Sequence, residues 1–457
     1  MASQLISLTI VMLVAALAPF VASIVPGRVV PEVVFLVFAG AILGPHCLNL
    51  VRTQGQALDL VSELGMAFLF LLAGYEVRPA DLLGRMGAHA SLCWFISLGA
   101  AIVAVKFLPA LVGFDGIAGV AFAIMLTTTA YGTLAPIIRA RELDGTPVGN
   151  AVTAYGVTGE VLPVLAMAFL LSTRSKATTT IVIAVFLAVC VVCALLPRFM
   201  ERMGSRLRSF LAENLASRSE PVLRFVVFLL VFLITFATLS DLDSVLGAFA
   251  AGFVLRSIFP KGLSPLDEKI EGIGNGFLIP VFFVVSGAKI DLAVAFSDPS
   301  LLVLFIALLV AIRGVAVWVS LRINPETRRM SWEERFSATT YCVMALPLIV
   351  AITARAQEMG FMESSVASVL VTAGAITVLF VPVITSIVRV STAAHPVGAV
   401  IEIAHGEASA PQVWREHREA YLAEERKFSA AKERKSVRRG RKLSSAEFFA
   451  RIRDDKE

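Results

Sequence analysis

Charged residues are scarce in this sequence. Asp, Glu, Lys and Arg make up 16% of the 457 residues, whereas hydrophobic residues make up 57%. Soluble domains carry roughly 25% charged residues, so this composition excludes an ordinary soluble protein and indicates an integral membrane protein. Apolar runs recur along the chain, and a run of about 20 residues is long enough to span a bilayer as a helix.

The sequence also lacks the motifs of common enzyme classes. No GxGxxG, P-loop or HExxH pattern is present, and cysteine and histidine occur only five times each. Cys190 and Cys193 lie within one apolar run, where small apolar filler explains them better than a metal site. We therefore expect no enzymatic activity, no cofactor and no nucleic-acid partner. The net charge of +5 comes largely from loops and the C-terminal tail.

We expect an all-α membrane protein with about thirteen transmembrane helices. No basic segment precedes the first apolar run, so we interpret that run as a spanning helix rather than a signal peptide. The expected spans are 4–24, 31–46, 57–76, 86–111, 114–139, 147–172, 178–199, 222–240, 243–259, 267–288, 299–321, 334–355 and 364–389.

The distribution of arginine and lysine between the spans predicts their orientation in the membrane. With the N-terminus outside, the inner segments are the basic ones, and the segment 198–218 alone carries five arginines. Cytoplasmic loops are enriched in Arg and Lys, so we expect an N-out/C-in topology with an odd number of spans. The outer segments carry only scattered basic residues, which are Arg52, Arg174, Lys176, Lys289 and Arg355.

An internal repeat relates the two halves of the chain. FLFLLAGYEV at 68–77 resembles VFFVVSGAKI at 281–290, and TLAPII around Pro136 resembles MALPLIV around Pro347. These matches share an offset near 212 residues, which corresponds to seven expected spans. Because seven is odd, the second copy enters the membrane from the opposite side. The sequence therefore predicts two inverted six-helix repeats, an architecture of transporters whose ion site lies where the repeats meet.

Spans five and twelve have polar centres that weaken a helix. Threonine runs, Gly and Pro leave backbone N–H and C=O groups without helical hydrogen bonds. At membrane depth such groups are tolerated only where they are buried in protein or line a cavity. Each span alone is explained by a kink whose hydroxyls bond to helix carbonyls. As a matched pair they predict broken helices that cross at mid-membrane and place helix-end charges there. The residues concerned are Thr127, Thr128, Thr129, Tyr131 and Pro136, and in span twelve Thr340, Tyr341 and Pro347.

Two opposite charges lie deep in apolar runs, Glu160 in span six and Arg313 in span eleven. A charge at bilayer depth costs roughly 2.5–3.5 kcal/mol, so it is usually kept for ion or proton handling. Removal from water disfavours the charged form of a carboxylate. Glu160 can therefore bind a proton or a small cation, and the two compete for the same carboxylate. This competition couples their transport. The alternative is a structural Glu160 that is permanently paired with Arg313.

We expect the ion and proton site to consist of Glu160, Thr158, Gly159, Thr128 and Thr129, with the transported Na⁺ or K⁺ on Glu160. Hydroxyl and freed carbonyl oxygens suit such hard cations. A guanidinium stays protonated, so the expected role of the span-eleven arginine is charge compensation when the site is empty. A structural anchor is the alternative role for it.

The charges at the ends of spans are weaker candidates. Asp59, Glu63 and Glu76 bracket span three, and Glu63 is placed to line an entry funnel. His46 and His89 lie at span ends, where most histidines have no special role. Residues 391–457 are highly charged and predict a helical or partly disordered cytosolic tail. A regulatory contact of this tail and a plain solvated terminus fit its composition equally well.

Five stretches carry a resemblance to a known family, namely 31–45, 63–76, 247–252, 276–283 and 286–289. With them, the membrane part resembles the monovalent cation:proton antiporter superfamily, in the branch that contains bacterial Na⁺/H⁺ and Kef-type K⁺/H⁺ exchangers. The resemblance implies exchange of Na⁺ or K⁺ for protons by a multi-pass protein of the bacterial inner membrane. The implied partners are a monovalent cation, protons, the lipid bilayer and a second copy in a homodimer.

The resemblance also implies a division of the membrane domain, residues 1–390. Spans within 1–76 and 222–288 would form a dimer scaffold, and spans within 86–172 and 299–389 an ion-carrying core that slides like an elevator. Span 178–199 would link the two repeats.

The sequence departs from the superfamily at its ion site. Members of the superfamily carry an Asp-Asp or Asn-Asp pair where this chain has Gly159-Glu160, while the basic residue of span eleven is kept as Arg313. With one carboxylate instead of two, we hypothesise a one-for-one, electroneutral exchange. The alternative is a channel-like or sensory membrane protein that retained the fold and lost transport.

Overall fold

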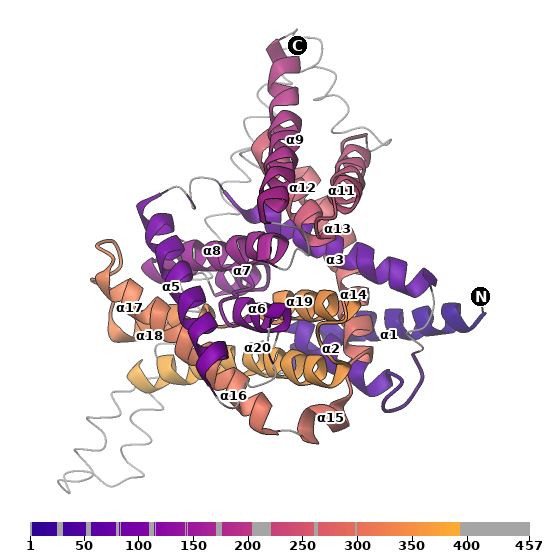
Figure 1. Ribbon diagram of the computed structural model, residues 1–457. Helices are drawn as coiled ribbons and strands as arrows, with labels where there is room; N and C mark the ends of the chain where they lie inside the picture. Colours follow the sequence, from indigo (N-terminus) through magenta and orange to yellow (C-terminus); the bar gives the residue numbers. More distant parts are fainter. Residues whose placement is uncertain are drawn as a thin grey trace, which may run out of the picture. The chain divides into compact units, whose positions relative to one another are not determined.

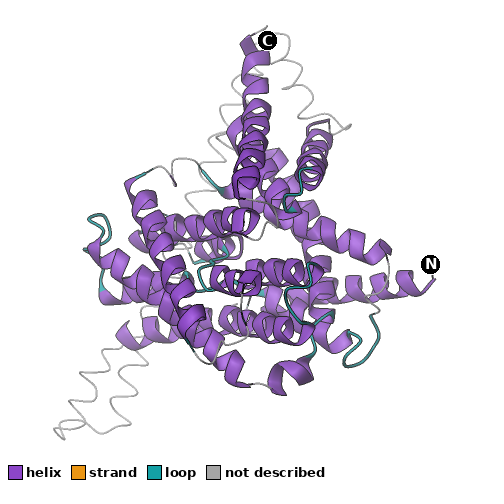
Figure 2. Cartoon of the chain, in the orientation of Figure 1, coloured by secondary structure: helices purple, strands orange, loops and turns teal. Residues whose placement is uncertain are grey.

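In the computed structural model the described residues form helices joined by turns and loops, with no strand among them (Figures 1 and 2). The expected tail lies outside these residues from position 394 onward. The described residues are 2–24, 31–51, 56–78, 82, 84–108, 114, 116–141, 143, 145–170, 176–202, 221–259, 264–297 and 299–393.

Two π-helical turns interrupt otherwise α-helical segments, η3 (Gly274–Leu278) and η4 (Val310–Gly314). The helices of the first half are α1 (Ala2–Ile24), α2 (Glu32–Leu43), α3 (Gln56–Glu76), α5 (Arg85–Phe107), α6 (Gly116–Met125), α7 (Tyr131–Ala140), α8 (Pro147–Leu170) and α9 (Lys176–Arg202). Those of the second half are α11 (Pro221–Leu239), α12 (Ser244–Ile258), α13 (Ser264–Ile273), α14 (Ile279–Ala288), α15 (Leu292–Ser297), α16 (Pro299–Leu309), α17 (Val315–Ile323), α18 (Trp332–Tyr341), α19 (Leu346–Glu358) and α20 (Ser364–Ala393).

Nine helical segments in the described part of the chain are long and apolar enough to cross a membrane. Each of the thirteen expected spans overlaps one of these nine or one of the shorter apolar helices. The all-α membrane fold is thereby confirmed, whereas the count of thirteen crossings, the orientation and the inverted repeats stay predictions. The shorter apolar helices are Glu32–Leu43, Gly116–Met125, Thr179–Val192 and Ser244–Ile258.

Glycines bring four helices into backbone contact. A Cβ atom at Gly40 of α2, or at Gly44 directly after α2, would overlap the backbone of α14, and a Cβ at Gly252 of α12 would overlap the backbone of α3. Small residues at helix contacts permit this close approach, which holds helices together in a bilayer. We call α2, α3, α12 and α14 the first helix group, because α3 packs on α12 and α14, and α14 packs on α2.

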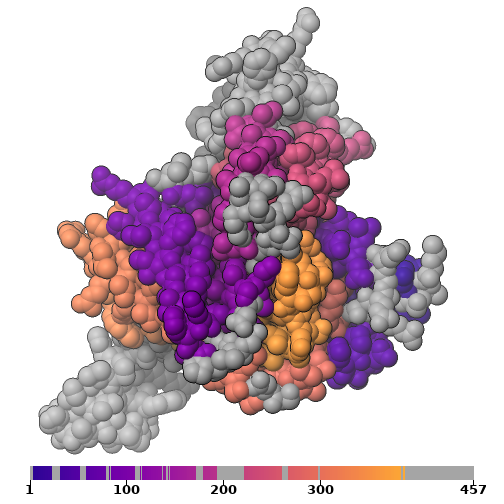
Figure 3. All heavy atoms as spheres, in the orientation of Figure 1, coloured from indigo at the N-terminus to yellow at the C-terminus, as the bar shows by residue number. Residues whose placement is uncertain are grey.

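A second helix group surrounds the interrupted helices and consists of α5, α6, α7, α8, α17, α18 and α19. Within it, α8 packs against α5, α6, α7 and α18, while α6 packs against α19. In the space-filling view the violet atoms of α5 adjoin the salmon atoms around α17 (Figure 3). The helix α9 contacts α12 of the first group and α8 of the second. The division into a scaffold and a moving core stays a prediction.

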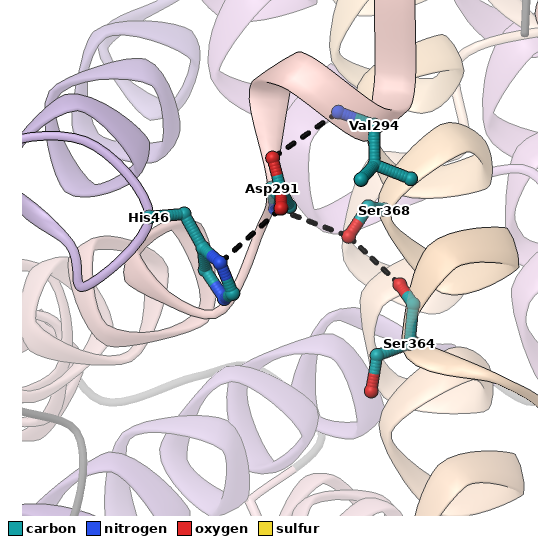
Figure 4. A network of polar contacts seen from close by, with 5 residues as sticks. All are labelled: His46, Asp291, Val294, Ser364 and Ser368. Atoms are coloured by element: carbon teal, nitrogen blue, oxygen red, sulfur yellow. Dashed lines mark hydrogen bonds and ion pairs between the residues drawn. The ribbon is translucent and has the colours of Figure 1, made fainter. Parts of the chain in front are cut away.

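The chain passes from the first group toward the second at Asp291, between α14 and α15 (Figure 4). One carboxylate oxygen of Asp291 accepts the Val294 amide at 3.1 Å, and the other lies 3.2 Å from His46 Nδ1. The Asp291 amide donates to Ser368 Oγ of α20 at 3.1 Å, and that hydroxyl donates to the Ser364 carbonyl at 2.8 Å. Asp291 thus joins the turn after α2, the start of α15 and α20.

Candidate functional site

Two helices are interrupted inside the second helix group, as the sequence predicts. Helix α6 gives way to α7 across residues 126–130, and α18 gives way to α19 across residues 342–345. The two interruptions meet, because the Ala130 amide donates to the Met344 carbonyl at 2.7 Å. Figure 1 shows α6 and α19 side by side at this place. We call residues 126–130 and 342–345 together the crossing.

The prolines lie at different places relative to the crossing. Pro347 is buried in the first turn of α19, where a missing N–H costs nothing. Pro136 lies inside α7, so the backbone is interrupted ahead of this proline rather than at it. Tyr131 begins α7, and Tyr341 ends α18 with its hydroxyl accepting from Arg141 Nη1 at 2.7 Å.

Most of the predicted threonines are buried, and four of them donate their hydroxyls to carbonyls three or four residues earlier in the chain. Thr127 Oγ1 donates to the Ile124 carbonyl at 2.7 Å, and Thr128 Oγ1 to the Met125 carbonyl at 2.8 Å. Thr158 Oγ1 donates to the Ala154 carbonyl in the same manner, at 2.7 Å, as does Thr340 Oγ1 to the Phe336 carbonyl. A hydroxyl that gives its proton to a carbonyl still presents oxygen lone pairs to a cation.

Thr129 behaves differently, because it joins three separate elements. Its hydroxyl donates to the Cys342 carbonyl at 2.5 Å, and its amide donates to the Gly159 carbonyl at 2.8 Å. The same hydroxyl accepts from Arg313 Nε at 3.1 Å. Thr129 therefore connects both halves of the crossing to α8 and η4.

Glu160 lies on α8 with 3% of its surface exposed. Its carboxylate accepts the Gly132 amide at 3.2 Å, and the Tyr131 amide also bonds to it. These are the first amides of α7, which have no partner inside the helix. The N-terminus of a helix carries a partial positive charge, so α7 offers the Glu160 carboxylate both donors and a favourable field.

Arg313 is fully buried in η4 and does not pair with Glu160. Its Nη2 donates to the Tyr155 carbonyl at 2.7 Å, and its Nη1 has no partner among the described residues. The permanent Glu160–Arg313 pair, which the sequence left open as an alternative, is not present in this structure. π-Helical turns recur at functional sites, and this one carries the arginine into the second helix group.

Gly159 leaves the space that Arg313 occupies. A Cβ at this position would overlap Arg313 Nη2 and would lie 2.8 Å from Thr129 Oγ1. One turn earlier, Tyr155 supplies the carbonyl that the same guanidinium binds. Helix α8 therefore presents one face to Arg313, through positions 155 and 159, and a different face to α7, through Glu160.

Glu76 is a second, partly buried carboxylate, and the sequence indicated it only as a charge at the end of a span. Its Oε1 pairs with Arg139 Nη2 at 2.9 Å, while its Oε2 is buried without a partner among the described groups. Its charge repels that of Glu160. One feature of the sequence is consistent with the position of Glu76 beside α7. Ala73 lies one turn before Glu76 on α3, and a small residue there permits close approach of α7.

Two cavities lie between α3 of the first group and α19 of the second, with volumes of about 330 and 350 Å³. Glu63 and Glu358 line both cavities, whereas Glu160 lines neither. Asp59 and Lys289 lie 3.5 Å apart on the wall of the first cavity. On the wall of the second, Arg355 pairs with Asp243 at 3.1 Å and so ties α19 to the start of α12.

A helical bundle with nine candidate spans in its described part, and with a buried acid at two interrupted helices, defines a multi-pass membrane protein. The sequence model of the family described as "Sodium/hydrogen exchanger, transmembrane" matches residues 11–390. The chain belongs to this family. The resemblance inferred from the five sequence stretches is thereby confirmed.

Named relatives and a solved structure agree with this assignment. The chain is 24% identical over 395 residues to "Putative Na(+)/H(+) antiporter YjbQ" of Bacillus subtilis strain 168, covering 82% of this chain and 62% of the relative's length. It is 21% identical to "Probable Na(+)/H(+) antiporter 3" of Methanocaldococcus jannaschii, covering 78% of this chain and 89% of that protein.

The solved structure of the sodium proton antiporter MjNhaP1 from M. jannaschii at pH 8 matches with a TM-score of 0.56 and 14% identity. The match covers 84% of this chain and 96% of the other. At this low identity the structural match shows the fold alone.

Proposed function

We propose that the protein exchanges a monovalent cation, Na⁺ or K⁺, for protons across a membrane, with Glu160 as the shared site. The observation that carries the proposal is the position of Glu160, buried on α8 and facing the first amides of α7 at the crossing. A carboxylate withdrawn from water in this way binds a proton or a cation in turn. The names of the relatives, which are Na⁺/H⁺ antiporters, support the same reaction.

The predicted ligands Thr128 and Thr158 offer oxygen atoms that suit the proposed cation. Thr128 and Thr158 give their hydroxyl protons to carbonyls of their own helices, so their oxygens remain available as ligands. Hard monovalent cations prefer such neutral oxygens together with one carboxylate. Glu76 adds negative charge from α3, and Arg139 offsets most of it, so the site keeps one uncompensated acid. This balance supports a one-for-one, electroneutral exchange.

The fixed charge of Arg313 completes the proposed site. It bonds to the Tyr155 carbonyl and the Thr129 hydroxyl, where it offsets the negative ends of backbone dipoles beside an empty site. Because a guanidinium does not lose its proton, the proton that is exchanged belongs to Glu160 rather than to Arg313.

We further propose that the second helix group moves against the first as an elevator. The contacts between the groups are polar at both ends of α3, where Glu76 pairs with Arg139 and the cavities around Glu63 separate α3 from α19. Such contacts exchange partners at lower cost than a dry apolar interface. The expected setting is a homodimer in a bacterial inner membrane, with residues 391–457 available for regulatory contacts.

A proton-flux assay in proteoliposomes tests the proposal, with Na⁺, K⁺ and Li⁺ supplied separately. An imposed gradient of at least one of these cations should drive protons in the opposite direction through the wild-type protein. Glu160→Gln should abolish this proton flux while the protein still inserts. Glu333→Gln serves as the matched control, because Glu333 is exposed at the start of α18. A wild-type protein that is inert with all three cations, or a fully active Glu160→Gln variant, contradicts the proposal.

A further inference from the structure

Four consecutive amides, of residues 129–132, run from the crossing into the start of α7, and each donates to an acceptor on another element. The Thr129 amide donates to the Gly159 carbonyl, and the Ala130 amide donates to the Met344 carbonyl. The next two amides, of Tyr131 and Gly132, donate to the Glu160 carboxylate. The direction of the last two amides therefore depends on how the first two residues are held.

Arg313 is the side chain that holds the first of these residues. Its Nε donates to Thr129 Oγ1 at 3.1 Å and its Nη2 to the Tyr155 carbonyl at 2.7 Å, so one planar group spans from the crossing to α8. A lysine ammonium keeps the charge but has a single nitrogen, and it lacks the fixed fork that reaches two acceptors on different elements. The contact thus depends on shape as well as on charge.

The guanidinium fits only because position 159 has no side chain. A Cβ there would overlap Nη2 and would also lie 2.9 Å from Thr129 Cβ. Neighbouring Gly314 differs, since a Cβ at that position would make ordinary contacts of 3.5 Å or more. Gly159 and Arg313 therefore form one steric unit, which we call the Gly159–Arg313 brace.

We propose that Arg313 is a positioning residue, seated in the space that Gly159 leaves, which holds Thr129 so that the first amides of α7 point at Glu160. This inference rests on the proposed function and extends it, because it gives the arginine a geometric role in addition to its charge. If charge alone mattered, lysine would replace the arginine. If the brace matters, Arg313→Lys and Gly159→Ala disturb the same contact and have the same consequence.

Deuterium uptake by the detergent-solubilised protein tests the geometry directly, whether or not transport is measured. Peptides that cover residues 126–132 should exchange faster in Arg313→Lys and in Gly159→Ala than in wild-type protein. Gly314→Ala is the matched control and should exchange like wild-type protein. Unchanged uptake at 126–132 in both variants overturns the proposal.

Exchange kinetics in proteoliposomes separate the brace from simple charge compensation. Each of the two variants should raise the apparent KM for the transported cation by about tenfold, which corresponds to about 1.4 kcal/mol of lost binding free energy. The double variant should be no worse than the poorer single variant, because both changes break one contact. A Lys variant with wild-type KM, or a double variant whose effects multiply, overturns the proposal.

Thr129 provides the test if the first two variants fail to insert. Thr129→Val removes the hydroxyl at nearly constant volume and should reproduce the rise in KM and the faster deuterium uptake. Thr129→Ser keeps the hydroxyl and should behave like wild-type protein. Equal behaviour of the Val and Ser variants overturns the proposal. A wild-type protein that transports nothing defeats the proposed function instead, and the uptake measurement then still decides whether the brace exists.

Discussion

At the scale of single residues, backbone amides rather than a basic side chain face the Glu160 carboxylate. Arg313 lies nearby, but its bonds go to Thr129 and to the Tyr155 carbonyl. Amides at a helix start stabilise negative charge without adding a permanent positive charge to the site. A bound cation therefore meets Glu160 without having to displace an arginine from it, which suits a site that must load and unload repeatedly.

Glu76 is expected to strengthen cation binding at Glu160 through its charge. Glu76→Gln removes a partly buried negative charge that acts on Glu160 and leaves Arg139 without its partner. The apparent KM for the cation should rise by about threefold to tenfold, the scale of a charge interaction of roughly 1 kcal/mol. Transport kinetics in proteoliposomes measure this change.

Glu271→Gln is the control for this prediction, because Glu271 belongs to the same charge cluster but is exposed to solvent. It should leave the KM near the wild-type value. A Glu76→Gln variant with wild-type KM would show that Glu76 serves the ion pair with Arg139 alone.

At the scale of elements, the sequence located the two interrupted helices but not their partners. Threonine runs near 127–129 and 339–340 indicated a weak helix in each of the two predicted repeats, and the structure interrupts the chain close to these runs. The interruption falls ahead of Pro136, inside the threonine run, since the hydroxyls of Thr127 and Thr128 satisfy the last carbonyls of α6. A hydropathy pattern marks where a helix weakens, and the side-chain bonds decide where it ends.

The backbone groups that bind the site side chains could not be predicted from the sequence. Arg313 binds the carbonyl of Tyr155, and every residue carries such a carbonyl, so no residue type pointed to this one. Gly159 was predicted as a member of the ion site that replaces an acid, but not as the space that Arg313 fills, because sequence alone does not show which neighbour occupies an empty position. Glu76 was underestimated for a related reason, since its place at the end of a span looked like an ordinary interfacial charge.

Asp291 is expected to stabilise the α14–α15 connection by capping as well as by charge. Asp291→Ala removes both the bond to the Val294 amide and the pair with His46, whereas Asp291→Asn keeps a capping oxygen. Loss of such a cap costs about 0.5–2 kcal/mol, and a partly exposed ion pair contributes about 0–1 kcal/mol. The Ala variant should therefore unfold at a lower temperature than the Asn variant in detergent. Equal midpoints would assign the whole effect to the ion pair.

At the scale of the whole molecule, two helix groups differ in how they pack. The first group is closed by glycine contacts in which backbone meets backbone, as at Gly40 and Gly252. The second contains the crossing, where buried hydrogen bonds link interrupted chain segments. The proposed elevator requires such a pair, in which a group closed by backbone contacts lies beside a polar, interrupted group.

Electroneutral exchange gives a prediction for the whole transporter. With Glu160 as the one uncompensated acid, each cation moves against one proton and no net charge crosses the membrane. The exchange rate in proteoliposomes should stay the same when a potassium diffusion potential of either sign is imposed, with Na⁺ as the transported cation. A rate that follows the sign of the voltage would mean that a second proton moves, with Glu76 as the next carboxylate to examine.

Proton release on cation binding tests the central claim, that one carboxylate holds either a proton or a cation. Calorimetry of the purified protein in buffers of different ionisation enthalpy counts the protons released when the cation binds. Wild-type protein should release about half a proton per cation at the pH at which Glu160 is half protonated, and about one proton per cation at lower pH, where Glu160 is protonated before the cation binds. Glu160→Gln should release none. Cation binding without proton release in the wild-type protein, or equal release from the Gln variant, would contradict the account.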